Sequence, residues 1–277
     1  MKAVKQMPLE TYAPSQPLTE YIEMFWYWED YHPTHPRERI LPGGMMEITI
    51  NLSDVPFQID DGASHSIRGP MAAGARSTPF IIDTSQPMSI LSVWFKPGGA
   101  LPFFGVPGQE LHNLHLPLEI LWGTSANHLY DQLREAKSSA ERFCILECAL
   151  LARLYRADER HRAVHYALNI FRASPHTVKI RDVVDSIALS QTRFIQVFRE
   201  DVGMTPKQFC RVQRFQQSLK LIASQQSVNW VDVALACGYY DQAHFINDFR
   251  RLAGITPASY APQSREHNTN LPVHDAG

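Results

Sequence analysis

Apolar and polar positions follow one clear pattern between Lys179 and Tyr260, and that pattern occurs twice. The first copy spans Ile180 to Phe209, and the second spans Trp230 to Tyr260. Matching positions lie fifty residues apart before Tyr240 and fifty-one residues apart after it, as a single inserted residue would produce. A repeat of this length is typical of two copies of one supersecondary unit.

Each copy predicts two short helices joined by a tight turn. Four apolar residues of the first copy recur at the spacing of a single helix face: Ile180, Val183, Val184 and Ile187. Ser190 then stands where a helix N-cap is expected, and Phe194 and Phe198, one turn apart, anchor a second helix. The remaining signals are turns, stops and caps that the two copies share: Gly203 and Thr205-Pro206, then Gly238, Asp241, Gly254 and Thr256-Pro257. This arrangement is the helix-turn-helix pattern.

One longer helix is predicted between the copies, from Pro206 to about Ala223. Its apolar residues recur every three or four positions: Phe209, Val212, Phe215, Leu219 and Ile222. A helix of about 18 residues is about 27 Å long. That length could hold the two units roughly one DNA turn apart, where a turn is about 34 Å.

These residues resemble the AraC/XylS family of bacterial transcription regulators. Four pieces within the last hundred residues or so carry the resemblance: Arg214-Phe215-x-x-Ser218, Ala234-Leu235-Ala236-Cys237-Gly238-Tyr239-x-Asp241, Phe245-x-x-x-Phe249 and Gly254-Ile255-Thr256-Pro257-x-x-Tyr260. The resemblance implies sequence-specific binding of double-stranded DNA, with both recognition helices in successive major grooves. The first copy departs from the family pattern at Val184 and Ala188, where alanine and glycine are usual. This departure affects the expected geometry of its turn.

The polar face of each second helix supplies candidates for DNA contact, because glutamine and asparagine can bond adenine and arginine can bond guanine. The candidate base-reading residues are Gln191, Thr192, Ile195, Gln196, Gln242, Ala243, His244 and Asn247. The candidate phosphate contacts are Arg199, Arg211, Arg214, Lys220, Arg250 and Arg251. On a lone helix such residues are more often an ordinary solvated face. The duplication favours DNA contact for the helix faces as a group.

Charge is distributed unevenly along the chain. Residues 1–169 hold 14 Lys/Arg against 19 Asp/Glu, a net charge of −5. Residues 170–262 hold 11 against 7, a net charge of +4. The whole protein, at −2, is not a basic nucleic-acid binder, but its C-terminal part has the local positive charge that phosphate contact needs.

The N-terminal part is predicted to be rich in β-strands. Strand candidates are residues 46–51, 80–83 and 89–95, and the turns Ile40–Gly44 and Lys96–Gly99 flank two of them. The ordered pieces LPGGMMEITINL, RGPM, VWFKPGGALPFFGVPGQEL and PLEILWG resemble an uncharacterised domain often found ahead of the AraC-type DNA-binding half. That resemblance spans about residues 10–125 and implies a sensor-like role. Because the family's better-known sensor domains are cupin-like β-barrels, a barrel or a sandwich is expected.

The predicted fold class is α+β, with four segments along the chain. They are a β-rich sensor-like domain at 1–125, connecting or dimerisation helices at 126–157, a DNA-binding domain with two helix-turn-helix units at 158–262, and a disordered polar tail at 263–277. Leu129, Leu133 and Ala136 mark one connecting helix, and residues 141–155 form the second.

Other candidate chemistry is weaker. His112-x-x-His115 lacks a third ligand and the cupin metal pattern is absent, so neither metal nor cofactor is expected. Trp26, Trp28 and Trp94 could line a ligand pocket, although large aromatics near strands more often form core. The four cysteines lie in predicted helices without a CxxC motif and are expected to be buried, reduced thiols: Cys144, Cys148, Cys210 and Cys237.

The favoured function is a cytoplasmic transcription regulator, and not an enzyme, whose N-terminal domain senses a small molecule or a partner. No signal peptide is recognised after Met1, and the apolar stretch Phe143–Leu154 is too short to span a membrane. The family resemblance adds RNA polymerase as a partner, and the connecting helices could form a homodimer. The alternatives are an enzyme or DNA-repair protein that uses the helical half as an adaptor, and a ligand-binding protein that no longer binds DNA.

Overall fold

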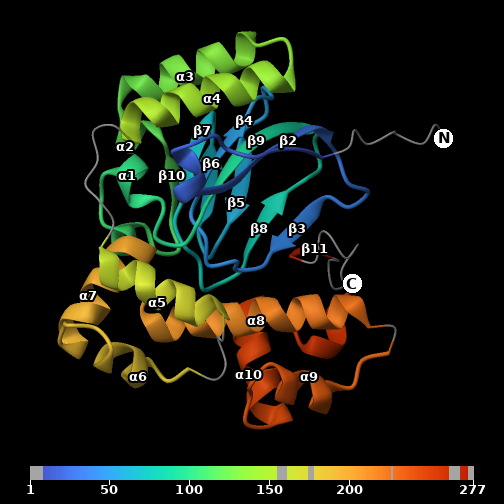
Figure 1. The fold of residues 1–277 in the computed structure, drawn as a ribbon. Coiled ribbons are helices and arrows are strands. Elements are labelled where there is room, and N and C mark those ends of the chain that lie inside the picture. The colour runs from blue at the N-terminus through green and yellow to red at the C-terminus, as the bar shows by residue number, and fades with distance from the viewer. Residues whose placement is uncertain (1–8, 155–160, 174–177, 226, 262–268, 274–277) are drawn as a thin grey trace.

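The computed structural model describes residues 9–154, 161–173, 178–225, 227–261 and 269–273. It places strands in the N-terminal part and helices in the C-terminal part, as the sequence predicted (Figure 1). Within the described residues, no helix is long and apolar enough to cross a membrane.

Two antiparallel sheets form the N-terminal domain. Sheet A has six strands in the order β1 (Glu10–Tyr12), β2 (Ile22–Tyr31), β9 (Met88–Phe95), β4 (Glu47–Asn51), β7 (Pro70–Ala73) and β10 (His115–Pro117). Sheet B has five strands in the order β11 (Asn270–Pro272), β3 (Arg37–Ile40), β8 (Phe80–Asp83), β5 (Phe57–Asp60) and β6 (Ser64–Ile67). The described strands thus form two sheets that do not close into one barrel.

Sheet A is covered on both faces, which explains its apolar sequence. In β9, Leu91 and Val93 are fully buried in the large core, while Met88 and Ile90 pack in a second cluster. That second cluster joins the two sheets, because it also contains Phe57 of β5. A strand buried on both faces reads as a nearly continuous apolar run.

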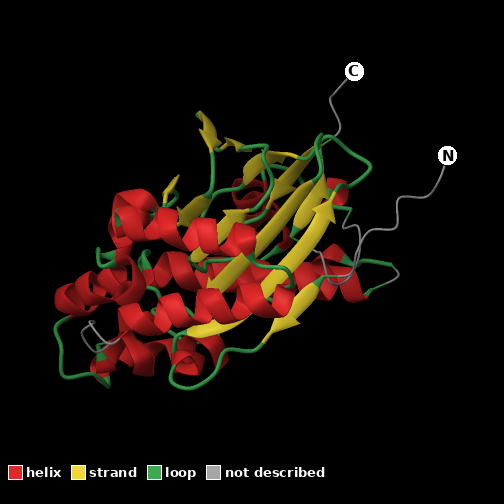
Figure 2. Cartoon of the chain, turned by 90° about the horizontal axis from the view of Figure 1, so that it is seen from above, coloured by secondary structure: helices red, strands yellow, loops and turns green. Residues whose placement is uncertain are grey.

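Helices α3 (Thr124–Glu135) and α4 (Ser139–Leu154) cover the outer face of sheet A (Figure 1), and the view from above shows helices lying across the strands (Figure 2). Phe143 of α4 stacks on Tyr12 at 5.4 Å between ring centroids. The short elements before α3 are η1 (Leu18–Glu20), α1 (Leu101–Phe104), η2 (Gly108–Leu111) and α2 (Glu119–Trp122).

The prediction that Cys144 and Cys148 belong to the core is wrong, since both are exposed. The buried face of α4 is formed by Phe143, Leu146 and Leu150. A spacing of four residues places two cysteines on one face of a helix, but it does not say which face is covered.

The C-terminal domain contains six described α-helices and a short 3-10 turn. They are α5 (Arg162–Ala173), α6 (Ile180–Asp185), α7 (Gln191–Val202), α8 (Pro206–Ser224), α9 (Trp230–Ala236), α10 (Gln242–Ala253) and η3 (Pro257–Ser259). The linker helix α8 has 19 residues, close to the predicted length. The predicted turn at residues 173–176 lies almost wholly outside the described residues.

The chain returns to the N-terminal domain after the last helix. Residues 263–277 were expected to be a disordered tail, yet Asn270–Pro272 form β11, which pairs with β3. Leu271 is 4% exposed and belongs to the core. Leu271 is the buried side chain of β11, and the largely polar composition of the segment concealed it.

Glycine-containing turns of the N-terminal domain form much of its contact with the helices. Gly44 lies against Val212 of α8, and Gly98 lies against Leu168 of α5. Gly108 meets the backbone of Gly203, which ends α7. The sequence predicted the turns at Gly44 and Gly98 but not the approach at Gly108, and the lack of side chains at these glycines allows the helices to approach.

Candidate nucleic-acid interface

The first helix-turn-helix unit is formed by α6 and α7. Ser190 caps α7 by accepting a hydrogen bond from the backbone N–H of Arg193 at 3.3 Å. Gly203 ends the helix in the left-handed conformation with φ of 83°. Phe194 and Phe198 are fully buried, as predicted, and this fixes which face of α7 remains open to solvent.

The second unit, α9 and α10, is built in the same way. Asp241 accepts from the backbone N–H of His244 at 2.7 Å, and Gly254 ends α10 with φ of 70°. Phe245 and Phe249 are fully buried, with ring centroids 5.7 Å apart. The predicted restart at Thr256-Pro257 is a 3-10 turn of three residues.

The turns of the two units differ where the sequence departs from the family pattern. Gly238 takes a left-handed conformation with φ of 71° in the second unit. Among the described residues other than glycine, only Asp30 and Asn113 have positive φ, so Ala188 of the first unit does not adopt this conformation. An alanine in that region would be strained, so the first turn follows a different path.

Helix α8 joins the units through aromatic packing. Phe209, near its start, meets Phe198 of the first unit at 5.9 Å between ring centroids. Phe215, at its midpoint, meets Phe249 of the second unit at 5.2 Å. Thr205 and Gln208 close a capping box at its N-terminus. The two units lie toward the lower edge of Figure 1, with the sheets above them.

None of the candidate base-reading residues is buried. Most are exposed, including Gln196 on α7 and Asn247 on α10, while Ile195 and Gln242 are partly exposed. Gln196 donates a hydrogen bond to Glu200 on its own helix at 2.9 Å. Gln196 and Asn247 therefore lie on the solvent-exposed faces of α7 and α10, away from the buried phenylalanines.

The candidate phosphate contacts fall into two groups. Four are exposed: Arg199, Lys220, Arg250 and Arg251. The other two are engaged within the fold. Arg211 pairs with Asp248 of α10 at 2.7 Å, and Arg214 lies 5.1 Å above the ring of Tyr239. These two arginines hold the second unit against α8.

A buried polar network in the N-terminal domain was not anticipated. Asp61 accepts from Arg76 at 3.3 Å and lies 3.1 Å from Nδ1 of His115. The His115 side chain is fully buried, and its Nε2 has no hydrogen-bond partner among the described residues. Burial and the charge of Arg76 lower the pKa of His115 to about 4. Burial opposes a low pKa at Asp61, but its hydrogen bond with His115 and the Arg76 charge bring that pKa below its usual value.

Of the three tryptophans proposed as a ligand pocket, Trp26 and Trp28 pack against the same cluster between the sheets, and Trp94 contacts Trp26. Trp26 and Trp94 meet edge to face at 6.1 Å between ring centroids, and Trp94 Nε1 donates to Glu47 at 2.8 Å. Trp28 also packs on Tyr31, with 4.4 Å between ring centroids. Trp26 Nε1 is buried without a hydrogen-bond partner among the described residues.

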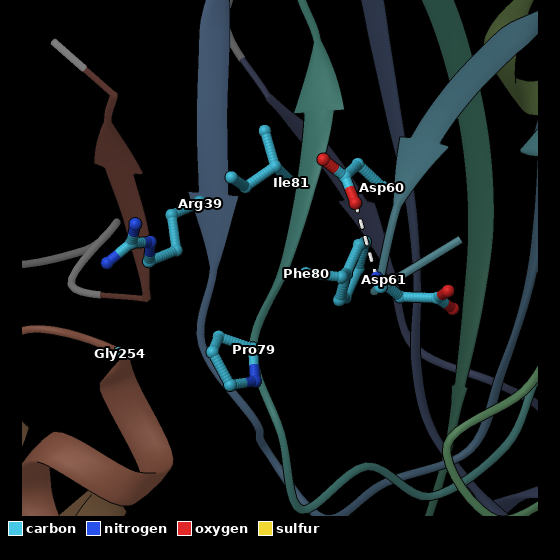
Figure 3. Close-up of a pocket in the computed structure, with 8 residues that line it drawn as sticks. Arg39, Asp60, Asp61, Pro79, Phe80, Ile81 and Gly254 are labelled. Atoms are coloured by element: carbon cyan, nitrogen blue, oxygen red, sulfur yellow. Dashed lines mark hydrogen bonds between the residues drawn. The ribbon is translucent and has the colours of Figure 1, made fainter. Parts of the chain in front are cut away.

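Two further features escaped the sequence analysis. Arg39 of β3 donates to the backbone carbonyl of Ala253, the last residue of α10, at 3.2 Å. A pocket beside this contact is lined by Arg39, Asp60, Asp61, Gly62, Pro79, Phe80, Ile81 and Gly254 (Figure 3). Successive strand residues point to opposite faces, so Arg39 and Glu38 must face opposite sides of the sheet. Nothing in the sequence indicates that Arg39 contacts α10.

Family comparison matches the N-terminal and C-terminal parts of the chain separately. Residues 10–117 match a domain of unknown function (DUF6597), and residues 183–263 match a helix-turn-helix domain. The chain therefore contains an AraC-type helix-turn-helix domain behind an N-terminal domain without an assigned role.

Two curated relatives are named as transcriptional regulators. The chain is 26% identical over 146 residues to the probable transcriptional regulator LumQ of Photobacterium leiognathi, covering 53% of this chain and 58% of the relative. It is 33% identical over 82 residues to an uncharacterised HTH-type transcriptional regulator of Haemophilus influenzae, covering 29% and 27%. The matches thus span about half of the first relative and about a quarter of the second.

Solved structures give a distant likeness. ToxT from Vibrio cholerae O395 aligns with a TM-score of 0.48 and 11% identity over 85% of this chain and 96% of that chain. An AraC-type transcriptional regulator from Chromobacterium violaceum aligns with a TM-score of 0.31 and 22% identity over 35% and 86%.

Proposed function

We propose that this chain, which carries an AraC-type helix-turn-helix domain, is a sequence-specific DNA-binding transcription regulator controlled by its N-terminal domain. One observation carries the proposal: α7 and α10 are built alike, are joined by one helix, and each exposes polar side chains opposite buried aromatic anchors. Helix faces of this kind read base edges in the major groove.

The DNA contacts are of two kinds. Base reading falls to residues of α7 and α10 such as Gln196 and Asn247, and Gln196 exchanges its bond to Glu200 for a base when DNA binds. Phosphate contact falls to the four exposed cations Arg199, Lys220, Arg250 and Arg251. Arg211 and Arg214 act indirectly, by positioning α10 against α8.

The N-terminal domain is the sensor in this proposal. A small molecule that binds one arrangement of the two domains better than another shifts the population and so alters DNA affinity. The space beside Trp26 and Trp94 is one candidate site, because the Trp26 N–H has no partner there among the described residues. RNA polymerase contact and a homodimer complete the proposal, as does a cytoplasmic location.

The test separates base contacts from phosphate contacts. Bound sites are first mapped across bacterial genomic DNA with purified full-length protein. Gln196→Ala and Asn247→Ala should each relax base preference at one position of the site and cost about 1–3 kcal/mol. Arg251→Ala should weaken binding to every sequence alike and reduce the salt dependence of affinity by about one ion.

Gln58→Ala is the matched control, because Gln58 is an exposed glutamine of β5 in the N-terminal domain. It should leave affinity and preference unchanged. If all three helix variants gave the same loss on every sequence, the assignment of reading residues would be wrong. If the protein selected no site at all, the proposed function would fail.

A further inference from the structure

The outer face of sheet B carries a row of three residues that face the end of α10. Strand register places Arg39 opposite Ile81, and Ile81 opposite Asp60. Paired residues in antiparallel strands point to the same side of a sheet, and neighbouring strands are about 4.8 Å apart. A cation and an anion therefore flank one apolar residue, with their backbones roughly 10 Å apart.

This row lines a pocket of about 270 Å³ between the two domains. Figure 3 shows Arg39 and Asp60 on opposite sides of Ile81, with Pro79 and Phe80 beside them and Gly254 on the side of Arg39. Typical small-molecule pockets measure roughly 300–1,000 Å³, so an occupant must be small. The apolar lining indicates that its body is apolar.

The charges in the pocket are positioned for a molecule that carries both signs. Arg39 uses one N–H on the Ala253 carbonyl, and its guanidinium offers five donors in all. The half-exposed carboxylate of Asp60 accepts from the Gly62 N–H at 3.2 Å and lies 3.8 Å from Arg37. A carboxylate accepts several hydrogen bonds, so Asp60 can also receive an ammonium group.

A molecule with a single charge fits this pocket less well. An anion bound at Arg39 would be repelled by the carboxylate of Asp60 and by the negative end of the α10 dipole. A cation bound at Asp60 would be repelled by the guanidinium groups of Arg39 and Arg37. Asp61, the second acid of the lining, is already engaged by Arg76 and His115.

We propose that this interdomain pocket binds a small zwitterion of the amino-acid type. Its carboxylate pairs with Arg39, its ammonium group pairs with Asp60, and an apolar side chain lies over Ile81 and Pro79. The site is distinct from the space beside Trp26 and Trp94, which lies on the other side of sheet B.

Occupancy would reach the DNA-binding domain through Arg39. The ligand carboxylate carries a full negative charge, so it attracts the guanidinium more strongly than the neutral Ala253 carbonyl does and draws Arg39 away from α10. Loss of the Arg39–Ala253 bond removes one contact that holds α10 against the N-terminal domain. This step rests on the proposed function, whereas ligand binding itself does not.

The first experiment measures binding without DNA. The twenty amino acids are titrated into the full-length protein by calorimetry, and each binder is compared with its decarboxylated amine and its deaminated acid. At least one aliphatic or aromatic amino acid should bind, and both singly charged analogues should bind about tenfold more weakly or worse. Binding by no amino acid, or equal binding by one analogue, would overturn the proposal.

Variants then locate the site. Arg39→Gln and Asp60→Asn should each weaken binding about tenfold. Asp83→Asn, at an exposed aspartate of β8 on the same outer face, is the matched control and should change nothing. Far-ultraviolet circular dichroism checks that each variant is folded. Binding that survives both pocket variants but is lost in Trp94→Phe would place the ligand between the sheets and sink the proposal.

A DNA experiment separates the two proposals. The amino acid that binds should change affinity for the mapped site by about fivefold or more in the wild type, and Arg39→Gln should reproduce that change without ligand. If the ligand binds but the protein recognises no DNA site, the pocket stands and the proposed function fails. If DNA is recognised but ligand and Arg39→Gln leave affinity unchanged, the coupling through Arg39 is wrong.

Discussion

At the scale of single residues, His115 is a histidine whose pKa folding lowers strongly. It is buried between Arg76 and Asp61, and the pKa of its ring is about 4 against an ordinary value of 6.5. Between these values the unfolded chain binds a proton that the folded chain does not. The free energy of unfolding should therefore fall as pH is lowered from about 6.5 to 4.

The predicted effect is a difference between wild type and His115→Asn. Urea unfolding at pH 7 and pH 5 should show the wild type losing about 2 kcal/mol more than the variant over this interval. Glu47, whose pKa is raised mainly by burial, titrates in the opposite sense, but it is present in both proteins and cancels. Equal losses in the two proteins would show that His115 is protonated in the folded state.

Single residues also show where sequence reasoning succeeds and where it stops. Gln196 and Asn247 could be placed on open faces because the caps and phenylalanines fix the phase of each helix. Arg211 and Arg250 look equivalent in the sequence. In the structure, Arg211 is paired with Asp248, 37 positions later in the chain, whereas Arg250 is exposed.

At the scale of elements, local signals predicted types and bounds well. The strand at Phe80–Asp83 and the 19-residue helix α8 agree with the sequence because period and caps are local properties. The residues that a turn contacts are not determined by the local sequence. The turns at Gly44 and Gly98 were recognised, but their packing on α8 and α5 depends on residues more than sixty positions away.

Among the glycine contacts with the C-terminal helices, the one between Gly108 and the end of α7 is the most crowded. A Cβ at Gly108 would lie 2.9 Å from the backbone nitrogen of Gly203 and 3.1 Å from the carbonyl oxygen of Glu200. Neither backbone atom can move without shifting the end of α7. We expect Gly108→Ala to lower the free energy of unfolding by about 1–3 kcal/mol, measured by chemical denaturation.

Gly43→Ala is the control for this substitution. A Cβ at Gly43 would lie 3.8 Å from Met45 Cε, an ordinary contact, so the effect should stay within about 0.5 kcal/mol. A Gly108→Ala protein as stable as the wild type would mean that η2 and α7 are separated in solution.

At the scale of the whole molecule, the helical domain is tied to the sheets at both ends. It follows α4 along the chain, and after α10 the chain returns as β11 on the edge of sheet B. Arg39, opposite Leu271 in this pairing, also holds the end of α10. The sequence could not predict this closure, because three residues of strand within a polar tail give too short a pattern.

The return strand should restrict how the two domains move. Leu271 is the buried anchor of β11, and the Leu41 N–H donates to Thr269 at 2.9 Å just beyond it. We expect Leu271→Ala to release the strand, because it removes most of the one buried side chain that holds three residues of strand on the sheet. Amide hydrogen exchange at Leu41 should then accelerate, while exchange in β9, at the centre of sheet A, stays unchanged.

The same variant tests whether this restraint matters for DNA. With β11 released, the end of α10 keeps its bond to Arg39, but the chain that follows it is no longer paired with β3. The second unit should then tolerate an altered spacing between the two halves of the mapped site better than the wild type does. Val273→Ala is the control, because Val273 is less buried than Leu271 and its backbone bond to Arg37 does not need the side chain. Unchanged protection of Leu41 in Leu271→Ala would show that backbone pairing alone holds the strand.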